Sequence, residues 1–352
     1  MAVLMTKGEI YTGSLDIIVT HYKEPWELGK KLFDSIAFQR NVNFDDINVI
    51  IVNDGEENEL PEECFTGYPY EIHQMSIPKG GVSKARNAGL DASTADWVMF
   101  CDFDDCFQTV FGLYLIFCGM AEDKYDLIRA TFTEETVDNT GRMHLVSHDN
   151  DSVFVHGKVM RRQFLVDNEL RFHEGLRIHE DGFFNVLVYT IAKADGRETT
   201  ISTPVYLWAW NKDSVVRKDK AEDYVLDTYD HLMKQRIALT DEFIKRKMPE
   251  EIMLCVIKTV CDSYYDFQQH TWKTQKNKAK VERAERWFAA YLKRFAGYYA
   301  KANIMQVGEL AALSRARNVM KKTMLMESET LKEWMEHIMT DVRPIPMDEQ
   351  GV

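Results

Sequence analysis

Residues 97–105 read WVMFCDFDD, an apolar run that ends directly in carboxylates. A continuous apolar run of this length, bounded by polar residues, predicts a strand that is buried on both faces of a sheet. In an open α/β sheet, ligands bind beyond the carboxyl ends of the strands, which is where Asp102, Asp104 and Asp105 fall. Carboxylates this close repel one another, and a hard divalent cation such as Mg²⁺ or Mn²⁺ relieves that repulsion. The stretch therefore predicts a metal site at the end of a buried strand.

An alternative interpretation gives Asp105 a purely structural role. It would cap a helix that begins near Phe107, and the other acids would be solvated. Capping accounts for one carboxylate and leaves Asp102 and Asp104 without a role.

Strand and helix patterns alternate on either side of this stretch. In the first hundred residues, strands are expected at 15–20, 47–52 and 70–75, with helices at 26–38 and from 81 onward. This order predicts a mostly parallel, doubly wound α/β sheet. Further along we expect strands at 127–133, 153–160 and 204–210, and helices at 161–167 and 186–192.

The remaining chain has a different character. From about residue 221 the helical periodicity is almost continuous, with an interruption at 247–249. We therefore expect a catalytic α/β domain over 1–220 and an all-helical domain over 221–352, with the boundary near 218–222.

Composition limits the class of protein. The 352 residues are 45% hydrophobic and 12% aromatic, which is enough for a substantial core, and the net charge of -13 argues against a protein that coats polyanions in general. The start of the chain lacks the apolar segment of a signal peptide, and no run approaches the roughly 18–20 apolar residues of a membrane span. The six cysteines lack metal-ligand spacing, so we predict free thiols in a cytoplasmic protein.

Five short motifs occur in order along this part of the chain, namely IIVTHY at 17–22, VNDG at 52–55, GVSKARNAG at 81–89, DFD at 102–104 and HED at 179–181. Together they resemble family 2 glycosyltransferases of the GT-A fold, over residues 14–217 or so. The resemblance implies an inverting, metal-dependent enzyme of the hexosyltransferase type. It would move a sugar from a nucleotide-sugar, in the first place a UDP-sugar, to a hydroxyl acceptor.

The resemblance also implies roles for individual residues. The catalytic pair would be Asp181, as general base, and Glu180, and the metal (Mn²⁺ or Mg²⁺) would be held by Asp104 and Asp102. The nucleotide-binding set would be Thr20, Tyr22, Asp54, Arg86 and Asp102. Physical chemistry agrees, because a metal stabilises the departing diphosphate and a carboxylate can deprotonate the attacking hydroxyl.

Each of these motifs also has a structural interpretation. Arg86 and Asn87 could be a pair on a helix surface, and Asp54 a turn residue. Glu180 and Asp181 could stabilise the start of the following helix through its dipole.

The segment after the last predicted strand supplies further candidates. In the family this region closes over the diphosphate and presents aromatic rings to the sugar, which suggests roles for Trp208, Trp210, Ser214 and Arg217. Ordinary core packing is the alternative for the two tryptophans. No histidine lies between Asp181 and His231, so the third protein ligand of the metal is unassigned and water is the alternative.

Residues 273–301 concentrate positive charge in an otherwise acidic chain. The cations of this Lys273–Lys301 cluster accompany an apolar stripe at helical spacing, formed by Trp287, Tyr291, Phe295 and Tyr298. A solvated helix face that packs through its stripe is one interpretation. The other is an anion-binding patch for a phosphorylated polymer, nucleic acid or a membrane surface.

Two other functional classes compare with the enzyme. A catalytically silent nucleotide-binding protein could act through its helical tail, although the intact acidic motifs count against it. A Rossmann dehydrogenase is excluded because no GxGxxG follows the first strand. The acceptor could be a glycan, a teichoic-acid-type polymer, a protein or a modified DNA base, and the sequence is compatible with an oligomer without deciding it.

Overall fold

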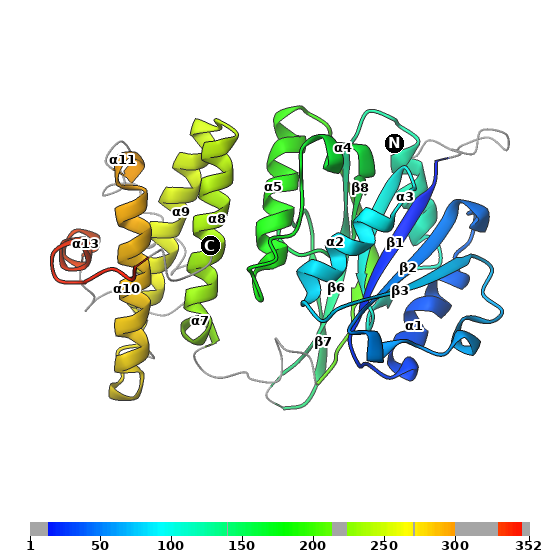
Figure 1. Cartoon of the computed structure of the whole chain (residues 1–352), viewed down its shortest axis with the longest axis horizontal. Coiled ribbons are helices and arrows are strands. Elements are labelled where there is room, and N and C mark those ends of the chain that lie inside the picture. The colour runs from blue at the N-terminus through cyan, green and yellow to red at the C-terminus, as the bar shows by residue number, and fades with distance from the viewer. Residues whose placement is uncertain (1–12, 139, 213–223, 270–271, 300–329, 347–352) are drawn as a thin grey trace. The chain divides into compact units, whose positions relative to one another are not determined.

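The computed structural model describes residues 13–138, 140–212, 224–269, 272–299 and 330–346 (Figure 1). The chain divides into two compact units, Met1–Lys212 and Asp213–Val352. The domain boundary expected near 218–222 lies outside the described residues.

The first unit is built on one mixed sheet with the strand order β3-β2-β1-β4-β8-β6-β9-β5, to which β7 adds by pairing with β6. Its parallel part matches the predicted alternation and consists of β1 (Leu15–His21), β2 (Ile47–Asp54), β3 (Glu71–Ile77) and β4 (Trp97–Asp102). Beyond β4 the pairing becomes largely antiparallel. That part contains β5 (Cys106–Phe107), β6 (Leu127–Val137), β7 (Met143–His148), β8 (Lys158–Arg161) and β9 (Glu198–Trp208).

Helices cover both faces of this sheet (Figure 1). They are α1 (Trp26–Ala37), α2 (Val82–Ala92), α3 (Gly112–Met120), α4 (Arg162–Asp167) and α5 (Glu180–Ala194). Single turns of 3₁₀-helix occur in the connections at Phe44–Asp46, Glu56–Asn58 and Glu62–Phe65.

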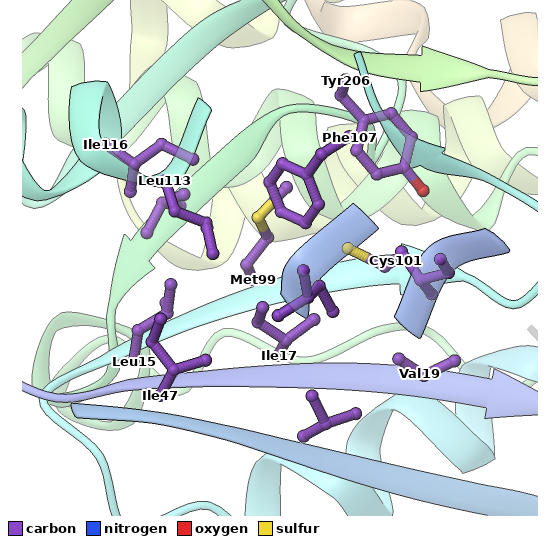
Figure 2. Close-up of a cluster of buried hydrophobic side chains, with 14 of the residues drawn as sticks. Leu15, Ile17, Val19, Ile47, Met99, Cys101, Phe107, Leu113, Ile116 and Tyr206 are labelled. Atoms are coloured by element: carbon purple, nitrogen blue, oxygen red, sulfur yellow. The ribbon is translucent and has the colours of Figure 1, made fainter. Parts of the chain in front are cut away.

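The strand β4 lies inside the core of this unit. Met99 and Cys101 point to the face covered by α1 and α3, where Leu113 and Ile116 pack (Figure 2). Phe100 points to the other face, against Phe172 and Phe184 at ring-centroid distances of 5.1 and 5.9 Å. The prediction of a strand buried on both faces is confirmed, and its carboxylates lie at the carboxyl edge of the parallel strands.

Two local predictions were wrong. Residues 153–157 were expected to begin a strand, but only Lys158–Arg161 pairs with the sheet, because the preceding polar groups are bound by side chains instead. No helix begins near Phe107, since Cys106 and Phe107 form β5 and α3 begins at Gly112. Asp105 is therefore not a helix cap.

The described residues of the second unit are helical, as predicted. The helices are α7 (Tyr224–Asp227), α8 (Tyr229–Lys245), α9 (Pro249–Phe267), α10 (Lys278–Arg294), α11 (Ala296–Tyr299) and α13 (Leu331–Thr340), with a 3₁₀ turn at Gln275–Asn277. Pro249 in the first turn of α9 explains the interruption of the pattern. Among the described helices, none combines the length and the apolar character needed to cross a membrane.

Candidate active site

The parallel strands bring several candidate residues to one edge of the sheet. Thr20 near the end of β1 lies opposite Val52 of β2 on one side and Asp102 of β4 on the other. Tyr22 and Asp54 lie at or just beyond the same strand ends. These predicted nucleotide-binding residues are therefore neighbours in space although they are distant in sequence.

Asp54 organises the loop that leads into α2. Its carboxylate accepts hydrogen bonds from the backbone N–H groups of Gly80 (2.6 Å) and Gly81 (3.0 Å). Gly81 has a φ of 89°, a conformation that side-chain-bearing residues rarely adopt. Lys79 in the same loop donates to the Tyr22 hydroxyl. Asp54 is thus the last residue of β2 rather than a turn residue, although its side chain has a structural role, and the nucleotide contact remains a prediction.

Arg86 is the centre of the site. Its side chain is only 4% exposed, and its guanidinium lies 3.0 Å from Asp102, 3.2 Å from Glu180 and 2.5 Å from Asp181. One cation thus joins the end of β4 to the first turn of α5. The interpretation of Arg86 as a helix-surface residue is wrong, because this face of α2 is covered.

The same arrangement sets the protonation of two acids. Burial favours the neutral form of Asp102, but the Arg86 guanidinium outweighs it and holds the pKa of this carboxyl below its ordinary value. For Glu180, burial and the neighbouring Asp181 raise the pKa to about 7, against the pull of Arg86. Glu180 therefore exchanges a proton near neutral pH in the absence of ligands.

Asp181 has a second partner besides Arg86. The backbone N–H of Val155 donates to its Oδ2 at 3.3 Å. The residue before the pair, His179, adopts a left-handed conformation with a φ of 66° and makes no side-chain cap for α5. The two carboxylates thus lie in the first turn of α5, where the helix dipole favours negative charge, and are also bound by Arg86.

Asp104 and Asp105 are bound by the end of β9 and by the segment that follows it. Asp104 accepts a hydrogen bond from the Asn211 amide at 2.7 Å, and burial raises its pKa. Asp105 is completely buried and accepts from the Tyr206 hydroxyl at 2.8 Å and from the Ala209 N–H at 2.9 Å. Burial, together with Asp102 and Asp104, raises the pKa of Asp105 well above its ordinary value.

A histidine completes this acidic cluster. His156 Nδ1 lies 3.5 Å from Asp105 Oδ2, is buried, and has no hydrogen-bond partner among the residues that the structure describes. One ligand atom each from Asp102, Asp105 and His156 lies within 4.8 Å of the others. Burial lowers the pKa of His156 to about 4, so the imidazole is neutral and free to bind a cation.

These side chains fit a divalent metal. Crowded carboxylates with raised pKa values gain from a bound divalent cation. Neither His156 nor a ligand role for Asp105 is predicted from the sequence. No local signal marks His156, which reaches the cluster from the segment that precedes β8.

Comparison with known proteins assigns this architecture. The profile of glycosyl transferase family 2 matches residues 16–173, which span β1 to the segment after α4. The chain carries a glycosyl transferase family 2 domain.

Relatives of the family 2 domain are distant. GgaA of Bacillus subtilis, a minor teichoic acid biosynthesis protein, is 27% identical over 176 residues, or 45% of this chain and 38% of GgaA. Glycosyltransferase GlyA of Streptococcus pneumoniae is 23% identical over 214 residues, or 53% of this chain and 29% of GlyA. The chain therefore spans well under two thirds of these relatives. Among solved structures, residues 1–349 of S. aureus TarS share the fold with a TM-score of 0.58 and 17% identity, covering 87% of this chain and 88% of TarS.

The end of β9 and the two residues after it pack against the family 2 domain. The Trp208 ring lies 5.4 Å from that of Phe154 and 4.9 Å from that of His156. The Trp210 N–H donates to Glu135 at 2.7 Å. For Trp208 these contacts favour core packing, the alternative to sugar stacking. Ser214 and Arg217 lie outside the described residues.

The Lys273–Lys301 cluster is partly paired within the helical unit. Arg283 and Arg294 each lie 2.8 Å from a carboxylate of α8, those of Asp230 and Asp241. Lys280 pairs with Asp227 of α7. These pairs favour the interpretation as a solvated face for much of α10. An anion-binding role for the rest of the cluster remains a prediction, and Lys301 is outside the described residues.

Proposed function

We propose that the family 2 domain transfers a sugar, with inversion, from a nucleotide-sugar to a hydroxyl acceptor, in the first place from a UDP-sugar. The observation that carries this proposal is the bridge at Arg86. It holds the strand-end Asp102 and the acidic pair Glu180–Asp181 on one guanidinium. A donor bound at the strand ends would therefore lie next to a carboxylate able to accept a proton.

On the donor side, Asp104 and Asp102 would hold the metal. Asp105 and His156 are further potential ligands, since they group with Asp102 in a cluster that does not include Asp104. A bound Mn²⁺ or Mg²⁺ supplies Lewis-acid stabilisation of the diphosphate as it leaves. An imidazole beside carboxylates supports Mn²⁺ over Mg²⁺ as the metal. Asp54 and Tyr22 at the neighbouring strand ends would bind the nucleoside, with Asp54 selecting uracil through its ring N–H.

On the acceptor side, Asp181 would act as general base. The acceptor oxygen forms its bond to the anomeric carbon while the bond from that carbon to the diphosphate oxygen breaks, and the hydroxyl proton passes to the Asp181 carboxylate. Attack from the face opposite the diphosphate inverts the anomeric configuration. Glu180 would orient the acceptor.

The acceptor we favour is a teichoic-acid-type polymer, which the name of the relative GgaA supports. The cations of the Lys273–Lys301 cluster outside the ion pairs given above would then contact its phosphates. A cytoplasmic location is supported by the cysteines, all six of which are free.

The test is Asp181→Asn, which keeps the shape of the side chain but cannot take up a proton at neutral pH. Nucleotide-sugar affinity should survive while turnover falls by roughly 10²–10⁴-fold. Asp195→Asn, at the other end of α5, is the matched control and should turn over normally. A near-normal Asp181→Asn enzyme, or a product that retains the anomeric configuration by NMR, would refute the proposal.

A further inference from the structure

The segment from Asn150 to Gly157, which precedes β8, connects the two sides of the site. It lacks regular secondary structure, yet Val155, His156 and Gly157 are buried. Its Val155 N–H reaches Asp181, and its His156 side chain faces Asp105. The contacts that hold this segment in place therefore also position the Val155 N–H next to Asp181, the proposed base.

Lys158, the first residue of β8, is a buried cation around which the segment folds. Its side chain is 2% exposed, and its Nζ donates to Asp151 Oδ2 at 2.7 Å and also to the Phe154 carbonyl. The same Asp151 oxygen accepts from the N–H groups of Val153 (3.0 Å) and Phe154 (2.9 Å). A buried charge is tolerated only when it is paired in this way.

One peptide group lies between Lys158 and Asp181. The Phe154 carbonyl accepts from the Lys158 ammonium, and the N–H of the same peptide group, which belongs to Val155, donates to Asp181. In a trans peptide the carbonyl oxygen and the amide hydrogen point in opposite directions. A cation at the oxygen therefore both orients the N–H toward the carboxylate and strengthens its donation, because linked hydrogen bonds polarise one another.

Other contacts keep this peptide group from shifting. Arg129 donates to the carbonyls of Asn150 (2.6 Å) and Asp151 (3.2 Å). Asn185, one turn after Asp181 in α5, donates to the Val153 carbonyl at 3.1 Å. At the far end Gly157 has a φ of 67°, and a side chain there would come within 2.7 Å of a backbone oxygen.

We propose that Lys158 is a positioning residue for Asp181, acting through the Phe154–Val155 peptide group. It holds one carboxylate oxygen on the Val155 N–H while Arg86 holds the other, which leaves the remaining lone pairs to the acceptor hydroxyl. This inference rests on the proposed function, because it takes Asp181 as the base.

The experiment compares Lys158→Met with Arg161→Met. Each removes a cation of β8 from its ion pairs, but Arg161 faces Asp123 and Asp126, away from the site, and Asp126 keeps Arg197 as a partner. Lys158→Met should lower kcat by roughly 10–100-fold, the worth of a hydrogen bond to a charged group, and change the donor KM by less than about twofold. Arg161→Met should lower only the Tm.

A double variant separates positioning from general damage to the fold. If Lys158 acts through Asp181, adding Lys158→Met to Asp181→Asn should cost less than about twofold more in kcat, whereas independent effects would multiply. Asp151→Asn keeps an oxygen for the backbone contacts but removes the anionic partner of Lys158. It should lower kcat by a smaller factor, again with little change in the donor KM. This variant replaces Lys158→Met if that protein fails to fold.

The outcomes are distinct. A folded Lys158→Met or Asp151→Asn enzyme with wild-type kcat, or multiplying losses in the double variant, overturns the inference and leaves the proposed function standing. Normal turnover by Asp181→Asn alone would instead refute the proposed function.

Discussion

Gly29 in α1 sets the position of Phe103, the residue between the two proposed metal ligands. A Cβ added at Gly29 would lie 2.2 Å from Cε1 and Cζ of the Phe103 ring, whereas ordinary contacts begin at 3.4 Å. In Gly29→Ala the ring must therefore retreat by more than about 1 Å. The substitution tests whether the packing under the acidic motif controls its function.

The ring has little room to move. Phe103 is 2% exposed, and its ring lies 4.7 Å from that of His21, 6.1 Å from Phe33 and 6.4 Å from Trp26. Overpacking of this kind costs about 1–3 kcal/mol, and the better helix propensity of Ala offsets about 1 kcal/mol. The expected net loss is about 0–2 kcal/mol, a fall in Tm of up to about 8 °C.

The functional effect should be larger than the loss of stability. Because other rings enclose Phe103, we expect its retreat to displace the backbone that carries Asp102 and Asp104, and a displacement near 1 Å at a catalytic group costs about 10²-fold in rate. We expect weaker Mn²⁺ binding in the presence of UDP, measured by calorimetry, and turnover reduced by about 10–100-fold.

The matched control is Gly297→Ala in α11, where an added Cβ would meet no atom within 4 Å. It should leave the Tm, metal binding and turnover unchanged. A Gly29→Ala protein with wild-type metal affinity and turnover would show that Phe103 does not transmit its position to the aspartates.

Three further substitutions address the charges of the site. Asp104→Ala should abolish metal-dependent UDP binding while circular dichroism shows an intact fold, and calorimetry giving wild-type affinity in Mn²⁺ would exclude Asp104 as a ligand. Wild-type protein should prefer UDP to CDP, because cytosine lacks the ring N–H that Asp54 would accept, and Asp54→Ala should lose the preference; equal affinities in the wild type would remove Asp54 from the base site. Arg86→Met leaves three acids without their cation and should cost about 3–5 kcal/mol at neutral pH without metal. Because Arg86 depresses the pKa of Asp102, its stabilisation is present above the unfolded pKa and is lost as pH falls; the defect in urea unfolding should therefore shrink below roughly pH 4–5, and a pH-independent defect would contradict this account.

The parallel part of the sheet was predictable because each of its strands is a local pattern. β4 is apolar on both faces, and β1 and β2 are apolar runs that end in polar turns. The antiparallel part of the sheet was less predictable from the sequence. Residues 153–155 are β-branched or aromatic, as in a strand, but the side chains of Asp151, Asn185 and Asp181 bind the backbone of this segment, which no local pattern reports.

The sequence by itself determined which residue types stand at the strand ends and at the start of α5, and hence the acidic motifs at 102–104 and 180–181. Only the tertiary structure decided how they are joined. Arg86 binds a residue 95 positions away from it in the chain, and His156 reaches Asp105 from the segment that precedes β8. Spacing along a chain specifies which face of its own helix or strand a side chain occupies. It does not specify which distant charge lies opposite, because that depends on how the elements pack.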